Sequence, residues 1–157
     1  MKEKLMDDND IKLICLLQEN ARYTLKKLSE QIYLSSPAVA ARIEKLQREG
    51  IITGYHADVN YEKLGYHIIA FINVEMSPKE KPGFIAFAKE DPNVLECNIV
   101  SGSYTMLIKA AFRTTSEMDR FISKVQRYGA TETNIVFSTP IPHRGICLAR
   151  EESENTN

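Results

Sequence analysis

Residues 24–50, TLKKLSEQIYLSSPAVAARIEKLQREG, decide the fold of the first part of the chain. Thr24 is a favourable cap for a helix whose apolar side chains recur at helical spacing, Leu25, Leu28 and Ile32. Only Tyr33 and Leu34 separate this helix from Ser35-Ser36-Pro37, where a serine before a proline predicts the start of another helix. Two helices joined by so short a turn are typical of a helix-turn-helix rather than of a parallel bundle.

The helix that begins at Ser36 has two contrasting faces, and Gly50 is a favourable stop after its end. At about 100° per residue, one narrow stripe is apolar and must face the preceding helices. It consists of Val39, Ile43 and Leu46. The opposite face carries mainly small and basic side chains, Ala38, Ala41, Glu44, Lys45 and Arg48, with Arg42 on its flank. Alanines allow close approach to a DNA groove, and basic side chains reach phosphates or guanine edges. The alternative is that this face is an ordinary solvent-exposed helix surface without a ligand.

The residues on either side of these two helices complete the expected unit. Asp7, Asp8 or Asn9 can cap a first helix that ends near residues 19–20 and carries a short apolar repeat, Leu13, Ile14 and Leu17. Residues 51–57, IITGYHA, have the composition of a β-strand. We expect this segment to pack beside the three helices as a short wing.

From residue 65 onward, strands and helices are expected to alternate. Residues 66–76 show apolar side chains with period two, and residues 94–101, 105–112 and 131–138 read as three further strands. Phe84, Phe87 and Ala88 mark a helix that ends before Asp91. Thr114 and Glu117 form a capping box for a second helix that Gly129 would stop. The order β-α-β-β-α-β predicts a ferredoxin-like domain, so the fold class is α+β.

The strand over residues 66–76 also suggests self-association. Its second face is apolar only at Ile69 and Phe71, and we expect this patch to meet another subunit. A two-fold symmetric dimer would match pseudo-palindromic DNA sites, because the symmetry of the protein is mirrored in the half-sites.

Composition restricts the class of protein without naming a function. The 157 residues are 43% hydrophobic and 26% charged, as in an ordinary soluble globular protein. No apolar run is long enough for a membrane span, and the charged N-terminus lacks a secretory pattern, so we expect a cytoplasmic protein without membrane contact. The net charge is −1, and any DNA-binding charge must therefore be concentrated on one face. Cys15, Cys97 and Cys147 are spaced neither for a disulfide framework nor for a metal site.

These patterns divide the chain into four parts. Residues 1–57 are the expected helix-turn-helix domain, residues 58–64 a linker, and residues 65–140 the ferredoxin-like domain. Residues 141–157 form a tail whose last eight or so residues have the polar composition of a disordered end.

Several segments occur together in an order that resembles the leucine-responsive and asparagine-synthetase regulator (Lrp/AsnC) family over about residues 7–140. They are DIKLI at 10–14, LQENAR at 17–22, LSSPAV at 34–39, RIEKL at 42–46, GII at 50–52, KLG at 63–65 and the loop at Gly102. The resemblance implies a sequence-specific transcription regulator rather than an enzyme, with a winged helix-turn-helix and an amino-acid-sensing, ferredoxin-like domain. It implies homodimers, tetramers of dimers (octamers) and small effectors bound between dimers, with no cofactor or metal.

The family resemblance also implies site residues. Those expected to contact double-stranded DNA are Ser35, Ser36, Pro37, Ala38, Ala41, Arg42, Lys45 and Arg48. Those expected near the effector are Gly102, Ser103, Tyr104, Thr105, Thr131, Glu132 and Thr133. The family commonly has an aspartate at the position of Thr105, and a threonine cannot hold an ammonium group by charge. Glu132 is a candidate for the missing carboxylate, and plain turn and strand-edge chemistry is the alternative for all seven.

Two other functions remain open from the sequence. A group of decarboxylases that act on haem precursors is similar in both halves, which would imply a tetrapyrrole enzyme without DNA binding. This chain has Ile51-Ile52-Thr53-Gly54-Tyr55 where those enzymes often show a basic pair. A sensor module that regulates another protein through its sheet is the third possibility. No nucleophile, phosphate-loop or dinucleotide motif occurs, and His56, His67 and His143 lack the spacing of metal ligands.

Overall fold

The computed structural model describes residues 6–146, and the contacts within the chain divide it into two compact units. One unit contains the residues up to Asp58 together with the segment that begins at Ile141. The other is Val59–Pro140, so most of the expected linker groups with the second unit and residues 141–146 of the expected tail with the first. The rest of the tail, with its expected disordered end, lies outside the described residues. No helix within residues 6–146 is long and apolar enough to cross a membrane.

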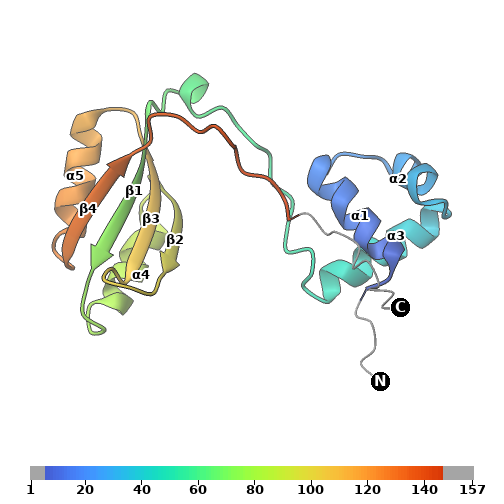
Figure 1. The fold of residues 1–157 in the computed structure, drawn as a ribbon, viewed down its shortest axis with the longest axis horizontal. Helices are drawn as coiled ribbons and strands as arrows, with labels where there is room; N and C mark the ends of the chain where they lie inside the picture. Colours follow the sequence, from blue (N-terminus) through green and yellow to red (C-terminus); the bar gives the residue numbers. More distant parts are fainter. Residues whose placement is uncertain (1–5, 147–157) are drawn as a thin grey trace, which may run out of the picture. The chain divides into compact units, whose positions relative to one another are not determined.

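The first unit is built from α1 (Asp8–Glu19), α2 (Leu25–Ile32) and α3 (Ser36–Arg48), as Figure 1 shows. Each helix begins after a side chain that accepts a hydrogen bond from a backbone N–H of the first turn, and these caps are Asp7, Thr24 and Ser35. The fully buried apolar side chains are Leu13, Leu28, Ile32, Val39 and Leu46, with Ile43 packed against them. The three predicted helices and the apolar stripe of the third are therefore confirmed.

The segment after α3 differs from its prediction in one respect. Gly50 has φ +71°, a left-handed conformation that ends the helix and that glycine adopts without strain. Ile51 and Ile52 then pack against the helical core, as expected of a wing. However, residues 53–60 form no strand. A β-type sequence needs a partner strand for its backbone hydrogen bonds, and the described part of this unit offers none, so the predicted strand was wrong.

The second unit is a four-stranded antiparallel sheet with two helices on one face (Figure 1). Its elements are a short 3₁₀ turn η1 (Glu62–Leu64), β1 (Ile68–Glu75), α4 (Lys81–Glu90), β2 (Val94–Ile99), β3 (Met106–Phe112), α5 (Thr115–Val125) and β4 (Ala130–Ile135). The strand order is β2-β3-β1-β4, which places the first and third strands in the centre. The predicted ferredoxin-like plan is confirmed, with all four strands shorter than expected.

The sheet has one buried and one open face. The buried face of the two central strands carries Ala70, Ile72, Val74, Met106, Ile108 and Ala110, and it packs against Phe84 and Ala88 of α4 and Phe121 and Val125 of α5. On the open face of β1, Phe71 retains 37% of its surface and Ile69 is half-buried. The alternation predicted for this strand is therefore confirmed. Because burial on one face fixes the register, a shift by one residue would expose the whole core row.

The boundaries of α5 correct two predictions. The hydroxyl of Thr114 accepts from the Glu117 N–H at 3.2 Å, but the Glu117 carboxylate accepts from the Arg113 N–H at 2.7 Å and not from the cap residue itself. The helix ends at Val125, so Gly129 is not its stop. Instead, Gly129 lies so close to the Glu75 carbonyl of β1 that a Cβ atom would overlap the oxygen.

Candidate DNA-binding and effector sites

The outer face of α3 is the candidate DNA-binding surface. Pro37, Ala41, Glu44 and Arg48 are all exposed and follow one another at helical spacing on the side opposite to buried Val39 and Leu46. Arg48 forms no ion pair with any residue in the described part of the chain, so its guanidinium is available to a ligand. Lys45 is half-buried and lies 4.0 Å from the Glu49 carboxylate. At that distance the pair is weak and exchanges readily for a phosphate.

The beginning of α3 is fixed by serine side chains. The hydroxyl of Ser35 accepts a hydrogen bond from the Ala38 N–H at 3.4 Å, which caps the helix. Ser36 is half-buried, and its hydroxyl donates to the Ser29 hydroxyl of α2 at 3.4 Å. Ala38 is also half-buried. Among the expected contacts at this end, Ser35 and Pro37 are thus more accessible than Ser36 and Ala38.

Arg42, also expected to contact DNA, is held by two carboxylates of the first helix region. Its Nη1 lies 2.6 Å from Asp10 and 2.7 Å from Asp7, and the side chain of Asp10 is only 2% exposed. The hydrogen bonds that its guanidinium donates to the Asp10 and Asp7 carboxylates raise the pKa of Arg42. Burial opposes the charge on Asp7, but the Asp10 N–H and the guanidinium together hold the pKa of Asp7 below its usual value. The arginine therefore joins α1 to α3.

Tyr33, in the turn between α2 and α3, was not among the expected site residues. It has φ +57°, the only positive φ of a non-glycine residue in the described chain, and it is 90% exposed. Tyr33 is the C-terminal cap of α2, a position where a left-handed residue, usually glycine, is common. The presence of tyrosine instead of glycine there was the signal that the sequence offered. The sequence alone could not show that this side chain would be so exposed.

Thr105, at the position where the family commonly has an aspartate, is engaged with the backbone of β1. Its hydroxyl accepts from the Met76 N–H at 3.2 Å and donates to the Val74 carbonyl at 3.2 Å. Its own N–H donates to the same carbonyl at 3.0 Å. The side chain thus fastens the start of β3 to the end of β1. Gly102 has φ +111° and forms the tight turn before it, and Ser103 is exposed.

Glu132 and Tyr104 are brought together from residues far apart in the sequence. The Tyr104 hydroxyl donates to the Glu132 carboxylate at 2.6 Å, and the Asn134 amide donates to the other oxygen at 3.3 Å. The tyrosine hydrogen bond raises the pKa of Tyr104 and lowers the pKa of Glu132, so the carboxylate stays charged. Thr131 accepts from the Gln126 amide at 3.3 Å. Thr131 and Thr133 are both half-buried on the face of β4 opposite to Glu132. Of the expected effector residues, Tyr104 and Glu132 form one cluster.

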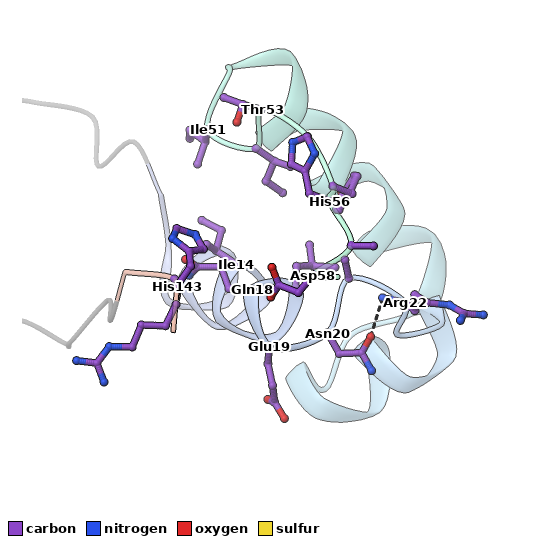
Figure 2. Close-up of a pocket in the computed structure, with 18 residues that line it drawn as sticks. Ile14, Gln18, Glu19, Asn20, Arg22, Ile51, Thr53, His56, Asp58 and His143 are labelled. Carbon is purple, nitrogen blue, oxygen red and sulfur yellow. Dashed lines mark hydrogen bonds between the residues drawn. The ribbon is translucent and has the colours of Figure 1, made fainter. Parts of the chain in front are cut away.

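An open cleft of about 710 Å³ in the first unit was not anticipated from the sequence. It lies between α1, residues 51–58 and residues 143–145, and Figure 2 shows His143 and Gln18 on one side with His56 and Thr53 across from them. The Gln18 amide donates to the Ile146 carbonyl at 3.2 Å and holds this part of the tail against α1. Within the described residues no group of His, Cys, Asp or Glu is arranged to hold a metal ion.

Comparison with known proteins matches both units. Residues 6–53 match the family model of a winged helix-turn-helix DNA-binding domain, and residues 69–146 match the Lrp/AsnC ligand-binding domain. The chain is 37% identical over 138 residues to the uncharacterized HTH-type transcriptional regulator YezC of Bacillus subtilis, covering 88% of this chain and 98% of the relative. It is 32% identical over 146 residues to the regulatory protein AsnC of Escherichia coli, covering 90% and 96%.

Solved structures agree with this assignment. A transcriptional regulator of Neisseria meningitidis, determined in complex with L-methionine, has a TM-score of 0.82 at 28% identity and covers 88% of this chain and 94% of its own. The structure of E. coli AsnC has a TM-score of 0.80 at 30% identity, covering 90% and 97%. A DNA-binding helix-turn-helix joined to a ligand-binding ferredoxin-like unit defines an effector-modulated transcription regulator. The chain belongs to the Lrp/AsnC family of such regulators.

Proposed function

We propose that this regulator reads DNA through the outer face of α3, with Arg48 as its main free cation. The supporting observation is the contrast along this helix, where Val39 and Leu46 are fully buried and Pro37, Ala41 and Arg48 are exposed. Small residues near the start allow the helix to enter the major groove, while Arg48 and Lys45 reach phosphates or base edges. Ser35 and Ser36 contribute polar groups at the groove end.

Arg42 is better suited to positioning than to contact. Its two carboxylate partners neutralise the guanidinium, and breaking the pair to reach a phosphate would leave the buried Asp10 carboxylate without its cationic partner. In this proposal Arg42 sets the angle between α1 and α3, and the other seven residues expected at the DNA surface remain candidates for contact.

Salt dependence tests the DNA-binding face. Each phosphate contact made by a cation releases counterions, so Arg48→Ala should reduce the slope of log affinity against log salt by about one unit. The probe is a duplex selected from a random-sequence library with the wild-type chain. Arg120→Ala, which removes an exposed arginine from α5, is the control and should leave the slope unchanged. An unchanged slope for Arg48→Ala would remove this residue from the interface.

DNA binding, tetrapyrrole binding and function in cells together separate the alternative functions. If the wild-type chain bound no DNA but formed an absorbing adduct with a tetrapyrrole, the haem-precursor decarboxylase would be favoured. If function in cells survived the loss of charge at both Lys45 and Arg48, a sensor that acts on another protein would be favoured.

We further propose that an amino acid or a related metabolite binds beside the loop at residues 102–105. The supporting feature is the charged carboxylate of Glu132, which can pair with an ammonium group that Thr105 cannot hold. The Neisseria regulator was solved with L-methionine, so this amino acid belongs in the first test panel. A ligand that binds only the folded state raises the unfolding temperature in a thermal-shift screen. A response to none of the twenty amino acids would contradict this part of the proposal.

Self-association through the open face of the sheet completes the proposed function. Phe71 is 37% exposed and Ile69 half-buried in a row with Lys109 and Asn134, so an apolar centre is flanked by polar groups. This composition fits a subunit interface. A homodimer in the cytoplasm, assembling further into a tetramer of dimers, would present several helix-turn-helix units to one DNA molecule. Light scattering that gave a monomeric mass at micromolar protein would contradict this assembly.

A further inference from the structure

Tyr33 adopts a strained backbone conformation, and no side-chain interaction within residues 6–146 compensates for the strain. Its φ of +57° and ψ of +41° lie in the left-handed region, which costs an L-residue other than glycine about 1–2 kcal/mol. The ring is 90% exposed. Across residues 6–146 its side chain has no hydrogen-bond, ion-pair or aromatic partner.

The neighbours of Tyr33 explain the backbone conformation but not the side chain. The Tyr33 N–H donates to the Ser29 carbonyl as a cap of α2, and the next residue, Leu34, packs against the helical core. Ser35 then caps α3. This tight path requires a left-handed residue at position 33, and glycine would supply it without strain. A large, exposed aromatic side chain at such a position points to a contact made outside the folded unit.

We propose that Tyr33 contacts the sugar–phosphate backbone of the bound DNA, with its phenol hydroxyl donating a hydrogen bond to a phosphate oxygen. This inference rests on the proposed DNA-binding role of α3. The N-terminal end of a recognition helix is the end that approaches the bases, and Tyr33 lies two residues before the cap of α3, within about 7 Å along the chain. From that position an exposed tyrosine can reach the DNA strand that borders the groove, and tyrosine hydroxyls are among the groups that bind phosphates.

The chemistry of this contact differs from that of Arg48. A neutral phenol releases no counterion when it binds a phosphate, so it adds affinity without adding to the salt dependence. It also carries no sequence information, so it fixes the register of α3 on the duplex while the helix face reads the bases.

Two substitutions test the proposal on the full-length chain, with the selected duplex as the probe. Tyr33→Phe removes only the hydroxyl and should weaken binding about tenfold with an unchanged salt slope. Tyr33→Gly should weaken binding at least as much, while relief of the backbone strain raises the unfolding temperature of the helix-turn-helix unit by about 2–4 °C. Tyr61→Phe, at a tyrosine that is 37% exposed in the second unit, is the control and should bind like the wild type.

The outcomes separate this inference from the function on which it rests. Loss of DNA affinity in Tyr33→Phe, together with higher stability in Tyr33→Gly, supports the contact. Wild-type affinity in both Tyr33 variants overturns the contact; if Arg48→Ala still lowers the salt slope, the proposed role of α3 stands without it. A fall in both stability and affinity for Tyr33→Gly, with normal binding by Tyr33→Phe, overturns it in favour of a structural role. Absence of DNA binding by the wild type would instead refute the proposed role of α3, and the contact with it.

Discussion

At the scale of single residues, the most informative group is Arg42 with Asp7 and Asp10. From the sequence, an arginine beside the exposed face of a recognition helix suggests a phosphate contact. In the fold, the same side chain pairs with a carboxylate that is 2% exposed and with a second one at the start of α1. Because a buried carboxylate without a partner is unfavourable, this pair fastens α3 to the first helix.

Arg42→Ala should therefore reduce stability more than a surface substitution does. We expect the free energy of unfolding to fall by about 2–3 kcal/mol, because Asp10 stays buried and loses its cationic partner, keeping only the hydrogen bond from the Asp7 N–H. This value allows for the partial exposure of Arg42. Urea denaturation followed by circular dichroism measures this change. Arg48→Ala is the matched control and should stay within about 0.5 kcal/mol of the wild type. Equal stability of the two variants would contradict the structural role of Arg42.

A second prediction at this scale concerns pH. Hydrogen bonds from Tyr104 and Asn134 lower the pKa of Glu132 from its ordinary value of 4.5. The carboxylate therefore keeps its charge as the pH falls to 4.5 and loses it only at lower pH, and effector affinity that depends on this charge follows the same course. Calorimetric titration with the amino acid found in the thermal screen should give near-constant affinity between about pH 7 and about pH 5. Glu132→Gln should bind about tenfold more weakly throughout that range. Unchanged affinity in this variant would exclude Glu132 from the site.

At the scale of elements, helix ends and strand contacts decide how the second unit is assembled. Gly129 connects α5 to β4, and it passes so near the Glu75 carbonyl of β1 that no side chain fits there. The contact brings β4 alongside β1, where Glu132 pairs in register with Asn73. A close approach between backbones thus positions the candidate effector carboxylate.

Two glycine substitutions should have opposite effects. Gly129→Ala should lower the free energy of unfolding by about 3 kcal/mol, because the added Cβ meets backbone atoms that cannot move aside. Gly83→Ala in α4 should raise it by about 0.5–1 kcal/mol, since its Cβ would lie 3.6 Å from the Tyr128 ring, an ordinary contact. Urea titrations of the two variants measure both changes. Similar effects of the two substitutions would contradict the close approach at Gly129.

At the scale of the whole molecule, charge and assembly are linked. Residues 1–64 contain ten basic and ten acidic side chains, so the DNA-binding unit has no excess positive charge to hold DNA nonspecifically. Linking two such units converts the second binding event into an intramolecular one, which raises the total affinity without any new contact. The open face of the sheet is the proposed means of linking them.

Phe71→Glu should therefore separate the subunits. The substitution removes the aromatic ring from the apolar centre of the interface, and burying the new carboxylate there is unfavourable even beside Lys109, so light scattering at micromolar protein should change from a dimeric to a monomeric mass. DNA affinity should fall by about a hundredfold as avidity is lost. Arg120→Glu, on the exposed side of α5, should change neither the mass nor, apart from a small electrostatic effect, the affinity. A dimeric mass for Phe71→Glu would place the interface elsewhere.

The sequence by itself determined the order and type of most elements. Helical spacing in α1–α3, period-two alternation in β1 and the caps Thr24, Ser35 and Thr114 are local signals, and each depends on residues a few positions apart. The family followed from an ordered set of such segments. Local signals failed at residues 53–57, where strand formation depends on a partner strand, and at Gly129, where the reason for glycine lies on β1.

Only the tertiary structure decided which side chains at the two sites are available. Asp10 and Arg42 are 32 positions apart and Tyr104 and Glu132 are 28 apart, and spacing along the chain does not reveal such pairs. The hydroxyl of Thr105 is likewise bound to β1, and the Tyr33 side chain has no hydrogen-bond, ion-pair or ring partner among residues 6–146. Whether a polar side chain is free depends on every group that the fold brings within hydrogen-bond distance. That environment is formed by packing between elements and not by the pattern within any one of them.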